Sequence, residues 1–370
     1  MNNSQKVLLV GPVAPPVHGQ SLAFSIIKDS LDKNGDCFFV NTNFTNSNNF
    51  IKLWSTLLYF FQISFIFVFK KNEFNKVYFT CSRSFMGSIK DLILLVFCSV
   101  FDKKCVNHVH GANFKSFIDS LPLFFRVIYI FLYEKVVIKT LVLIDKMGFE
   151  LGQVFKEHNF FTVNNPCEEN FALEVRDKSS ISPSNKNFIF FSNLMKSKGV
   201  VEVIEAFKVL KSEYSNVTLT ICGKPFGDRE VSKVSIKKII SDLTYGVHGV
   251  EVLFDGVYGR DKVNLFAKAD VFVLPSYYES EAIPISIIEA LASFNLIILS
   301  DHNYLKDFSD KYSFGFVCEK GSVSSLYSTM REVCDLDGIK SIDLKRRNRE
   351  IYEANFTQRN YVDKVLDSLR

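Results

Sequence analysis

The sequence lacks the cysteine spacings that indicate a disulfide framework. It has eight cysteines among 370 residues, and they are scattered without a C-x-x-C pair. This placement is typical of reduced, mostly buried thiols that behave as small hydrophobic residues. We therefore expect a cytoplasmic protein.

A strong charge of one sign is also missing. Lys and Arg number 44 and Asp and Glu 40, a formal net charge of +4, and no block of like charge stands out. This balance is too weak to indicate nucleic acid as a partner, although it is compatible with anionic lipid or phosphorylated ligands. The N-terminus, MNNSQKVLLVGP, lacks the apolar segment of a signal peptide and is expected to form a first strand.

Cofactor and metal motifs are missing as well. The dinucleotide fingerprint G-x-G-x-x-G is absent, which argues against a nicotinamide or flavin site. His108 and His110 end the strand expected at Cys105–Val109 and point to one side, because side chains alternate along a strand. A metal site would need further ligands, and no His, Cys or carboxylate cluster nearby supplies them. We expect neither a metal nor another cofactor.

Apolar and aromatic residues are abundant instead. Hydrophobic residues make up 47% of the sequence, and phenylalanine alone occurs 38 times. The longest apolar run, Phe50–Phe69, approaches the length of a membrane span, but Lys52 and Gln62 interrupt it and a strand is expected directly after it. We expect this run and Leu121–Ile138 to be helices that rest on a sheet and graze a membrane surface with their aromatic side chains.

The length and the alternation of strands and helices predict two α/β domains. Apolar strands such as Asn187–Phe191 are each followed by an amphipathic helix. Between Phe171 and Lys186 the composition shifts to serine, asparagine and charge, which is typical of a linker. We therefore expect a first domain at residues 1–175 and a second at residues 187–352.

The stretch that carries the chemistry is Ala269–Ser293, ADVFVLPSYYESEAIPISIIEALAS. Val271–Leu274 is predicted to be a strand buried in a parallel sheet, and an acidic loop follows it. A helix is expected from Ile283, with Glu281 just before it and Glu289 about two turns along it. A helix start suits phosphate, and carboxylates accept hydrogen bonds from sugar hydroxyls.

Glu281 and Glu289 form an E-x7-E motif, framed by the lead-in Pro-Ser-Tyr-Tyr-Glu and the tail Glu-Ala-Leu-Ala. An isolated E-x7-E is more often two solvated glutamates beside a core helix. With the strand, loop and tail in register, however, the stretch resembles the motif of retaining glycosyltransferases of family 4. The resemblance implies the α/β fold GT-B, in which two Rossmann-like domains face a central cleft. It also implies that the first domain binds the acceptor, that the second binds the nucleotide sugar, and that a final helix at residues 353–370 packs back on the first domain.

The resemblance implies roles for the acidic loop. Glu281 would contact the transferred sugar and Glu289 the nucleotide ribose. Glu279 matches a frequent acidic position that could share in the sugar contacts. Ser280 and Ala282 stand where glycines are usual, so their backbone N–H groups can serve the phosphates, although each Cβ narrows the approach.

Further donor contacts are implied outside that loop. Lys198 matches the family lysine that binds donor phosphate, whereas Asn193 stands in place of the arginine expected five residues earlier. Lys224 is a second candidate cation, and the helix start at Ile283 would stabilise the leaving diphosphate. Gly19 remains of the glycine-rich loop that lies under the diphosphate. The alternative for Lys198 is an ordinary surface lysine.

His110 is the candidate for a catalytic contact from the first domain. It opens the segment His110-Gly111-Ala112-Asn113-Phe114, which resembles the place where a family histidine reaches the donor sugar. Asn165 matches the family asparagine in the turn before the linker. The alternative for His110 is a structural histidine at the end of a strand.

Together these implications describe a retaining enzyme that moves a hexose-type sugar from a nucleotide-diphosphate sugar to a lipid-linked oligosaccharide acceptor. The process would be surface polysaccharide synthesis of the O-antigen or capsule type, at the inner face of the plasma membrane and without a metal. One alternative is a nucleotide-sugar 2-epimerase of the same fold, against which the lack of extra catalytic acids argues. Another is a non-catalytic membrane-associated assembly partner, against which the presence of both motif glutamates argues.

Overall fold

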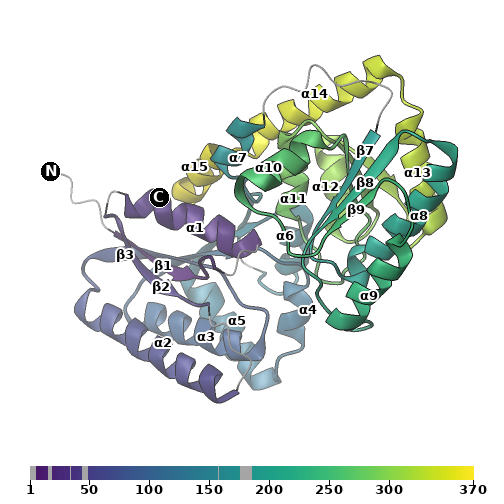
Figure 1. Ribbon diagram of the computed structural model, residues 1–370. Helices are drawn as coiled ribbons and strands as arrows, with labels where there is room; N and C mark the ends of the chain where they lie inside the picture. Colours follow the sequence, from purple (N-terminus) through teal and green to yellow (C-terminus); the bar gives the residue numbers. More distant parts are fainter. Residues whose placement is uncertain (1–5, 16–18, 34, 44–48, 157, 176–185) are drawn as a thin grey trace. The chain divides into compact units, whose positions relative to one another are not determined.

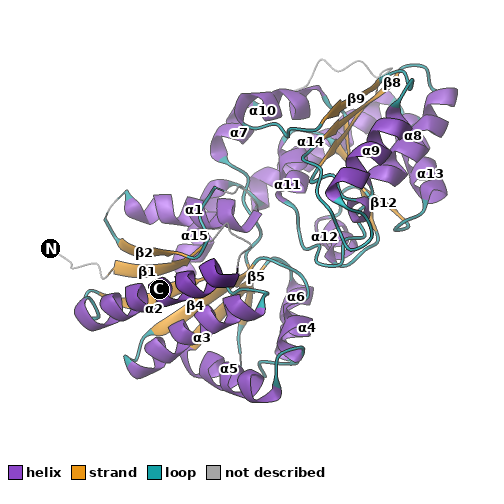
Figure 2. Cartoon of the chain, turned by 60° about the horizontal axis from the view of Figure 1, so that its bottom comes forward, coloured by secondary structure: helices purple, strands orange, loops and turns teal. Residues whose placement is uncertain are grey.

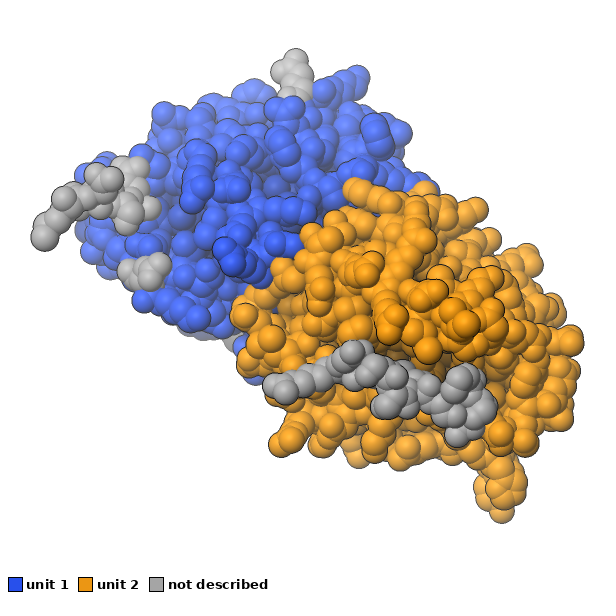
Figure 3. Space-filling model, turned by 90° about the horizontal axis from the view of Figure 1, so that it is seen from above, with its two compact units in different colours: residues 1–165, 359–370 blue, residues 166–358 orange. Residues whose placement is uncertain are grey.

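The computed structural model describes residues 6–15, 19–33, 35–43, 49–156, 158–175 and 186–370 (Figure 1). The chain divides into two compact units, one made of residues 1–165 and 359–370 and the other of residues 166–358 (Figure 3). Each unit is built on one six-stranded sheet. The predicted α/β class with two Rossmann-like sheets is therefore confirmed. The N-terminal residues 1–5 and residues 176–185 of the expected linker lie outside the described residues.

The first unit has a parallel sheet with the strand order β2-β1-β3-β4-β5-β6. Its strands are β1 (Lys6–Gly11), β2 (Cys37–Asn41), β3 (Phe74–Phe79), β4 (Lys104–Val109), β5 (Val137–Val142) and β6 (Phe160–Thr162). Its helices are α1 (Gly19–Asp32), α2 (Asn49–Phe69), α3 (Phe85–Val100), α4 (Phe114–Asp119), α5 (Leu123–Val136), α6 (Asp145–Gly152) and α15 (Gln358–Ser368).

Helices cover both faces of this first sheet. The helices α1 and α15 lie over one face, and α2, α3 and α5 lie over the other (Figure 1, Figure 2). Val365 and Leu369 at the end of the chain pack with Leu9 and Tyr78 in one buried cluster. This burial of apolar surface explains why the last residues belong to the first unit. The change of unit falls at residue 358 and not at the predicted residue 353.

The helix α2 is apolar on more than one side. Tyr59, Ile63 and Phe67 recur every four residues and are buried, at 2%, 0% and 0% exposure. Such spacing places them on the side that faces the rest of the unit. Phe61 and Phe65, in contrast, are 66% and 57% exposed. In the described part of the chain no helix has the length and apolar character needed to cross a membrane.

The second unit has a parallel sheet with the strand order β12-β11-β10-β7-β8-β9. Its strands are β7 (Lys186–Phe191), β8 (Val217–Cys222), β9 (Val250–Leu253), β10 (Val271–Leu274), β11 (Leu296–Ser300) and β12 (Phe316–Cys318). Its helices are α7 (Glu169–Glu174), η1 (Lys196–Lys198), α8 (Val200–Glu213), α9 (Lys233–Thr244), α10 (Gly259–Lys268), α11 (Ile285–Ala292), α12 (Tyr304–Tyr312), α13 (Val323–Cys334) and α14 (Gly338–Asn355).

The second unit begins earlier than the sequence predicts. Residues 166–175, expected in the first domain, belong to the second unit. The cause is the packing of α7, because the ring of Phe171 lies 5.6 Å from that of Phe266 in an edge-on contact. In addition, the backbone N–H of Cys167 donates to the carbonyl of Phe356 at 3.2 Å.

A buried ion pair holds α14 on the second sheet. Lys345 Nζ lies 2.6 Å from Asp270 Oδ1, and both side chains are almost fully buried. The other oxygen of Asp270 accepts the backbone N–H of Asn187 at 3.1 Å. Loss of one partner would leave an uncompensated buried charge, which is strongly destabilising. This pair is one of the contacts that join α14 to the second unit.

Candidate functional site

The site is built where β7 and β10 end, at the carboxyl edge of the second sheet. In a parallel sheet this edge gathers the loops that bind ligands. The short helix η1 follows β7, and Gly199 closes it with φ of 84°. A Cβ on Gly199 would lie 2.5 Å from the carbonyl oxygen of Pro275, which follows β10. Glycine therefore lets η1 and its Lys198 approach the end of β10 closely.

Lys198 and Glu281 form an ion pair at this edge. Lys198 Nζ lies 2.8 Å from Oε1 and 2.6 Å from Oε2 of Glu281, and the two side chains are 12% and 6% exposed. The hydroxyl of Ser276 donates to Oε2 of Glu281 at 2.5 Å. Two residues to which the sequence assigns phosphate and sugar are thus brought together. A ligand that contacts both Lys198 and Glu281 must share the hydrogen bonds between them or displace this ion pair.

The carboxylate of Asp228 holds the backbone of η1 in place through hydrogen bonds. Asp228 accepts the backbone N–H of Ser197 at 2.9 Å, as well as those of Glu230 and Val231. Burial would raise the pKa of Asp228, but these hydrogen bonds outweigh it and hold the pKa below its usual range. The ionised Asp228 therefore fixes the backbone next to Lys198.

The helix start differs from the prediction. The helix α11 begins at Ile285, and Pro284 is its N-cap with φ of −61° and ψ of 138°. Ile283 precedes a proline, and such a position is biased away from helical backbone, so it stays in the loop with 2% exposure. The backbone N–H groups available to an anion are therefore those at the start of α11, from Ile285 onward. Glu289 lies only about one turn along α11, not two.

Glu289 is buried and is paired with a lysine that was not among the predicted site residues. Lys262 on α10 forms an ion pair with Oε1 of Glu289, and the two side chains are 16% and 2% exposed. Burial raises the pKa of Glu289, and Lys262 offsets part of this effect. Burial would lower the pKa of Lys262, but Glu289 raises it above its usual value. Each partner therefore favours the charged form of the other, while burial leaves the pKa of Glu289 above its usual value.

The remaining predicted donor residues of the second unit lie at or near the surface. Glu279 is 2.9 Å from Arg229 in an exposed ion pair. Lys224 is exposed, with Nζ 5.4 Å from the ring centroid of Tyr258. Asn193 is exposed. Of these predicted residues only Lys224 carries a positive charge, and it lies at the surface beside Tyr258.

Ser280 and Ala282 line the loop between these groups. Ser280 is partly buried and Ala282 is 6% exposed. The backbone N–H of Glu281, which lies between them, donates to the carbonyl of Tyr278 at 2.9 Å. Ser280 and Ala282, whose Cβ atoms are expected to narrow the space for a phosphate, therefore belong to a turn that holds Glu281 in place.

In the first unit, His110 lies just beyond the end of β4. Its Nδ1 is 3.0 Å from Oδ1 of Asn165, so that nitrogen carries the proton and donates it. The ring of His110 lies 4.0 Å from that of His108, which confirms that the two point to one side. Asn165 thus orients the ring of His110 at the end of the strand. Gly19 is the first residue of α1 in the same unit.

His108 is a structural residue. Its Nε2 donates to the carbonyl of Val163 at 3.2 Å, so Nδ1 accepts from the hydroxyl of Tyr78 at 2.9 Å. Burial and the neighbouring His110 lower the pKa of His108 well below its usual value, so it is neutral. Among the described residues, no group of three or more His, Cys, Asp or Glu is arranged to hold a metal ion.

Sequence reasoning missed Lys262, Ser276 and Asp228. One signal could have found Lys262, since it precedes the buried Phe266 by four positions and so lies on the apolar side of α10. A lysine there needs a buried anion as its partner. No comparable signal in the sequence selects Ser276 or Asp228.

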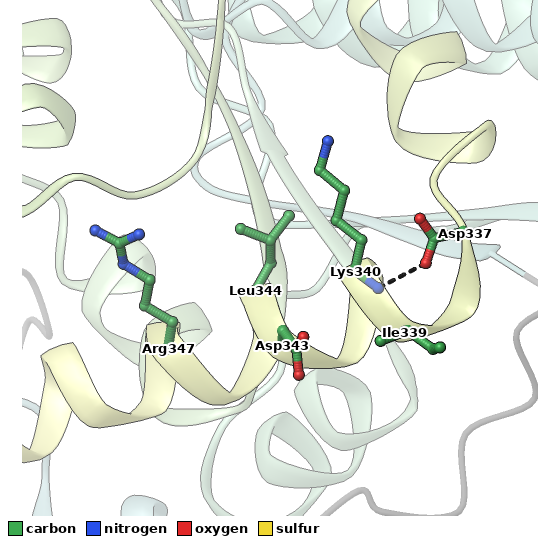
Figure 4. A pocket seen from close by; sticks show the side chains of 6 residues that line it. All are labelled: Asp337, Ile339, Lys340, Asp343, Leu344 and Arg347. Atoms are coloured by element: carbon green, nitrogen blue, oxygen red, sulfur yellow. Dashed lines mark hydrogen bonds between the residues drawn. The ribbon is translucent and has the colours of Figure 1, made fainter.

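A separate shallow hollow lies on the surface of α14 (Figure 4). It is lined by Asp337, Ile339, Lys340, Asp343, Leu344 and Arg347. The backbone N–H of Lys340 donates to Asp337 at 2.8 Å, which caps the helix. The lining contains none of the predicted site residues, so it is not part of the site around Glu281.

Comparison with known proteins adds a family context. Residues 172–354 match the model of the family described as glycosyl transferases group 1. Over 135 residues the chain is 24% identical to the lipopolysaccharide 1,2-N-acetylglucosaminetransferase of Salmonella typhimurium. This match covers 36% of the present chain and 35% of the relative, so it spans about a third of the relative's length.

Solved structures of similar fold cover almost the whole chain. A glycosyltransferase from Rickettsia africae has a TM-score of 0.69 at 14% identity and covers 98% of this chain and 97% of its own. HepE of Anabaena in complex with UDP has a TM-score of 0.71 at 14% identity, with 98% and 99% covered. Sucrose-phosphate synthase from Thermosynechococcus elongatus has a TM-score of 0.71 at 12% identity, with 98% of both chains covered. At these identities the likeness shows the fold alone.

Proposed function

Since this chain belongs to the group 1 glycosyl transferases and has the GT-B fold, we propose that it moves a hexose-type sugar from a nucleoside diphosphate sugar to a lipid-linked oligosaccharide. We further propose that the reaction retains the anomeric configuration and serves surface polysaccharide synthesis of the O-antigen or capsule type. The N-acetylglucosaminetransferase activity of the Salmonella relative and the UDP in the Anabaena structure support this choice.

The observation that carries the proposal is the cluster of Lys198, Glu281 and Ser276 next to the start of α11. A cation and a helix start favour a diphosphate, while an ionised carboxylate accepts hydrogen bonds from sugar hydroxyls. Lys198 Nζ lies 2.6 Å from Oε2 of Glu281. Their groups could therefore contact the two halves of one sugar–phosphate linkage. We assign the phosphate to Lys198 and the sugar to Glu281.

The proposed transfer proceeds without a covalent enzyme intermediate. The bond between the anomeric carbon and the donor diphosphate breaks, and the acceptor hydroxyl oxygen bonds to that carbon on the same face. The proton of the acceptor hydroxyl passes to the departing diphosphate. Lys198 and the backbone N–H groups at the start of α11 stabilise the leaving charge, so we propose that no metal is required. We assign a contact with the donor sugar to His110, whose ring Asn165 orients.

The first unit supports a lipid-linked acceptor through its exposed apolar surface. On α2, Trp54, Phe61 and Phe69 are 58%, 66% and 69% exposed, and on α5, Phe124 and Phe131 are 80% and 62% exposed. Both helices pack against α3. Large exposed apolar side chains on one side of a protein mark a contact with a partner or a membrane. Lysines at the helix ends and the aromatic rings suit a lipid interface. We propose peripheral binding to the inner face of the plasma membrane.

A direct test combines donor screening with product analysis. A ligand that binds only the folded protein raises its stability by mass action, so one class among UDP, GDP, TDP and ADP sugars should raise Tm. That donor should then yield a glycosylated lipid acceptor whose anomeric configuration, measured by NMR, equals that of the donor. Inversion would contradict the proposed stereochemistry.

Two other outcomes of this test would contradict the proposed function. Absence of both stabilisation and transfer across all donors and lipid acceptors would favour a non-catalytic role. Conversion of the donor to its 2-epimer without transfer would favour an epimerase.

A further inference from the structure

Lys262 and Glu289 are enclosed together by aromatic side chains of the second unit. Lys262 Nζ lies 5.4 Å from the ring centroid of Phe171 on α7 and 5.8 Å from that of Phe191 at the end of β7. Both positions suit a cation–π contact. Glu289 itself is 1% exposed. The two aromatic rings thus lie against the ammonium group of Lys262, whose side chain is 16% exposed and is paired with Glu289.

Few other charged or titratable groups act on this pair. Glu168, just before α7, raises the pKa of both Lys262 and Glu289. Cys167 lies close enough to feel both charges, and Arg349 on α14 also acts on Cys167. Glu168 is exposed and Cys167 is a buried thiol. Lys262 is therefore the cation that compensates the charge of Glu289.

The charge of Glu289 decides what it can bind. An ionised carboxylate only accepts hydrogen bonds and offers acceptor sites on both oxygens, so an ion pair on Oε1 is compatible with hydroxyl groups on Oε2. A protonated carboxyl donates a hydrogen bond from one oxygen and has fewer sites that can accept one. A ribose presents two neighbouring hydroxyls, which are best met by two acceptor sites.

We propose that Lys262 is a positioning residue that keeps Glu289 ionised and aimed, so that Glu289 can accept hydrogen bonds from the ribose hydroxyls of the nucleotide. This inference rests on the proposed function, because it takes Glu289 as the residue that contacts ribose. Lys262 acts through Glu289 and needs no contact with the donor of its own.

Without Lys262 the charge at Glu289 would change with pH. A carboxylate buried without a cation takes up a proton at higher pH than usual. In Lys262→Met, Glu289 should therefore be neutral near pH 7 and ionise only at higher pH. In the wild-type protein the ion pair should keep it charged across the neutral range.

The experiment measures nucleotide binding and stability in matched variants. Binding of UDP, GDP, TDP and ADP is measured at pH 6, 7, 8 and 9 for wild type, Lys262→Met, Lys262→Arg and Glu289→Gln. Lys268→Met is the control, since Lys268 is an exposed lysine on the same helix. Lys262→Met should weaken binding of the preferred nucleotide at pH 7 by about tenfold or more, with recovery toward pH 9. Lys262→Arg should restore most of it, and Lys268→Met should bind like wild type.

A stability readout separates this inference from the proposed function. Tm is followed from pH 5 to 9 for wild type, Lys262→Met and the double variant Lys262→Met, Glu289→Gln. A raised folded-state pKa at Glu289 makes stability fall as pH rises, so Lys262→Met should lose Tm over this range relative to the double variant. Equal pH dependence of the single and double variants, or wild-type binding by Lys262→Met at pH 7, would overturn the inference. If wild type binds none of the four nucleotides, the proposed function and the ribose role fail, whereas the pH dependence of Tm still decides whether Lys262 controls the charge of Glu289.

Discussion

At the scale of single residues, each glutamate of the E-x7-E motif has its own lysine partner. Lys198 contacts Glu281, and Lys262 contacts Glu289. A cation next to a carboxylate favours its ionised form, which accepts hydrogen bonds and does not donate them. The structure therefore places a positive charge beside each carboxylate of the motif.

Removal of the Lys198 ammonium should impair transfer strongly. We expect Lys198→Ala to lower kcat/KM by about 3–4 kcal/mol, the cost of removing one group that stabilises a developing negative charge. Asn193 is uncharged and Lys224 lies at the surface beside Tyr258, so we expect neither to compensate for the loss. The measurement is the donor-dependent rate of purified variants.

Lys196→Ala is the matched control for this variant. Lys196 also lies on η1, but its Nζ pairs with Glu230 at 2.8 Å in an exposed ion pair. Such pairs contribute about 0–1 kcal/mol, so the control should keep nearly full activity. Normal activity of Lys198→Ala together with loss in Lys224→Ala would place the diphosphate at Lys224 instead.

Substitution of the two glutamates should produce different kinetic defects. Glu289→Gln should weaken donor binding and raise KM, because ribose contacts are lost. Glu281→Gln should mainly lower kcat, because the contact with the reacting sugar is lost. Each loss of a charged hydrogen bond should cost about 1.5–3 kcal/mol. Equal changes of kcat and KM in both variants would contradict the division of roles.

At the scale of elements, α3 carries a buried acid that links it to the end of β3. Asp91 on α3 is 7% exposed, and its Oδ2 accepts the backbone N–H of Ser82 at 2.8 Å. Burial raises the pKa of Asp91 to about 7. The hydrogen bond from Ser82 and the charge of the neighbouring Lys90 lower this pKa in part. The charge of this helix contact therefore depends on pH in the neutral range.

This buried acid predicts a pH dependence of stability. Because the folded-state pKa is raised above the unfolded value, the stabilisation is present below about pH 4 and is lost as pH rises through about 7. The free energy of unfolding should fall by up to about 1.4 kcal/mol per pH unit in this window. Asp91→Asn should remove this part of the slope in urea titrations at pH 4 to 8.

Asp102→Asn serves as the control for the slope. Asp102 follows α3 and its side chain is 92% exposed, so the change should leave the pH dependence as in wild type. A slope in Asp91→Asn equal to that of wild type would show that Asp91 does not titrate in this range.

At the scale of the whole molecule, exposed apolar side chains are gathered on the helices α2 and α5 of the first unit. Trp54, Phe61 and Phe65 of α2 are each more than half exposed. In the second unit, Phe226 and Tyr245 are exposed aromatic residues in loops. The α2 surface is therefore the better candidate for contact with a membrane.

Membrane binding should depend on that α2 surface. The triple variant Trp54→Ser, Phe61→Ser, Phe65→Ser should lose flotation with anionic vesicles, whereas Phe226→Ser, Tyr245→Ser should float like wild type. Wild-type protein should leave membranes on washing with high salt or alkali, as expected of a helix in the interface. Resistance to both washes would contradict peripheral binding.

Local patterns in the sequence were sufficient for the fold class and for much of the site. Apolar runs such as Val271–Leu274 are β10 in the structure, because a strand buried on both faces needs a continuous apolar sequence. The spacing of Glu281 and Glu289 with their flanking residues was sufficient to identify the family. Such patterns involve residues close together in the chain, so they can be recognised without knowledge of the tertiary contacts.

Element ends were harder to predict, because they depend on packing and on caps. The helix α11 begins two residues later than expected, since Pro284 keeps Ile283 out of the helix. Likewise, α7 joins the second unit through contacts such as that of Phe171 with Phe266. The composition of the neighbouring linker could not reveal that contact.

By itself the sequence determined the α/β class, the E-x7-E motif and its position between a strand and a helix, because these depend on residues close together in the chain. Only the tertiary structure decided which cation each glutamate meets. Lys198 stands 83 positions from Glu281, and Lys262 stands 27 positions from Glu289. Ion pairs over such separations form only once η1 and α10 pack against the carboxyl edge of the sheet. Burial there raises the pKa of Glu289, and Lys262 offsets part of that rise.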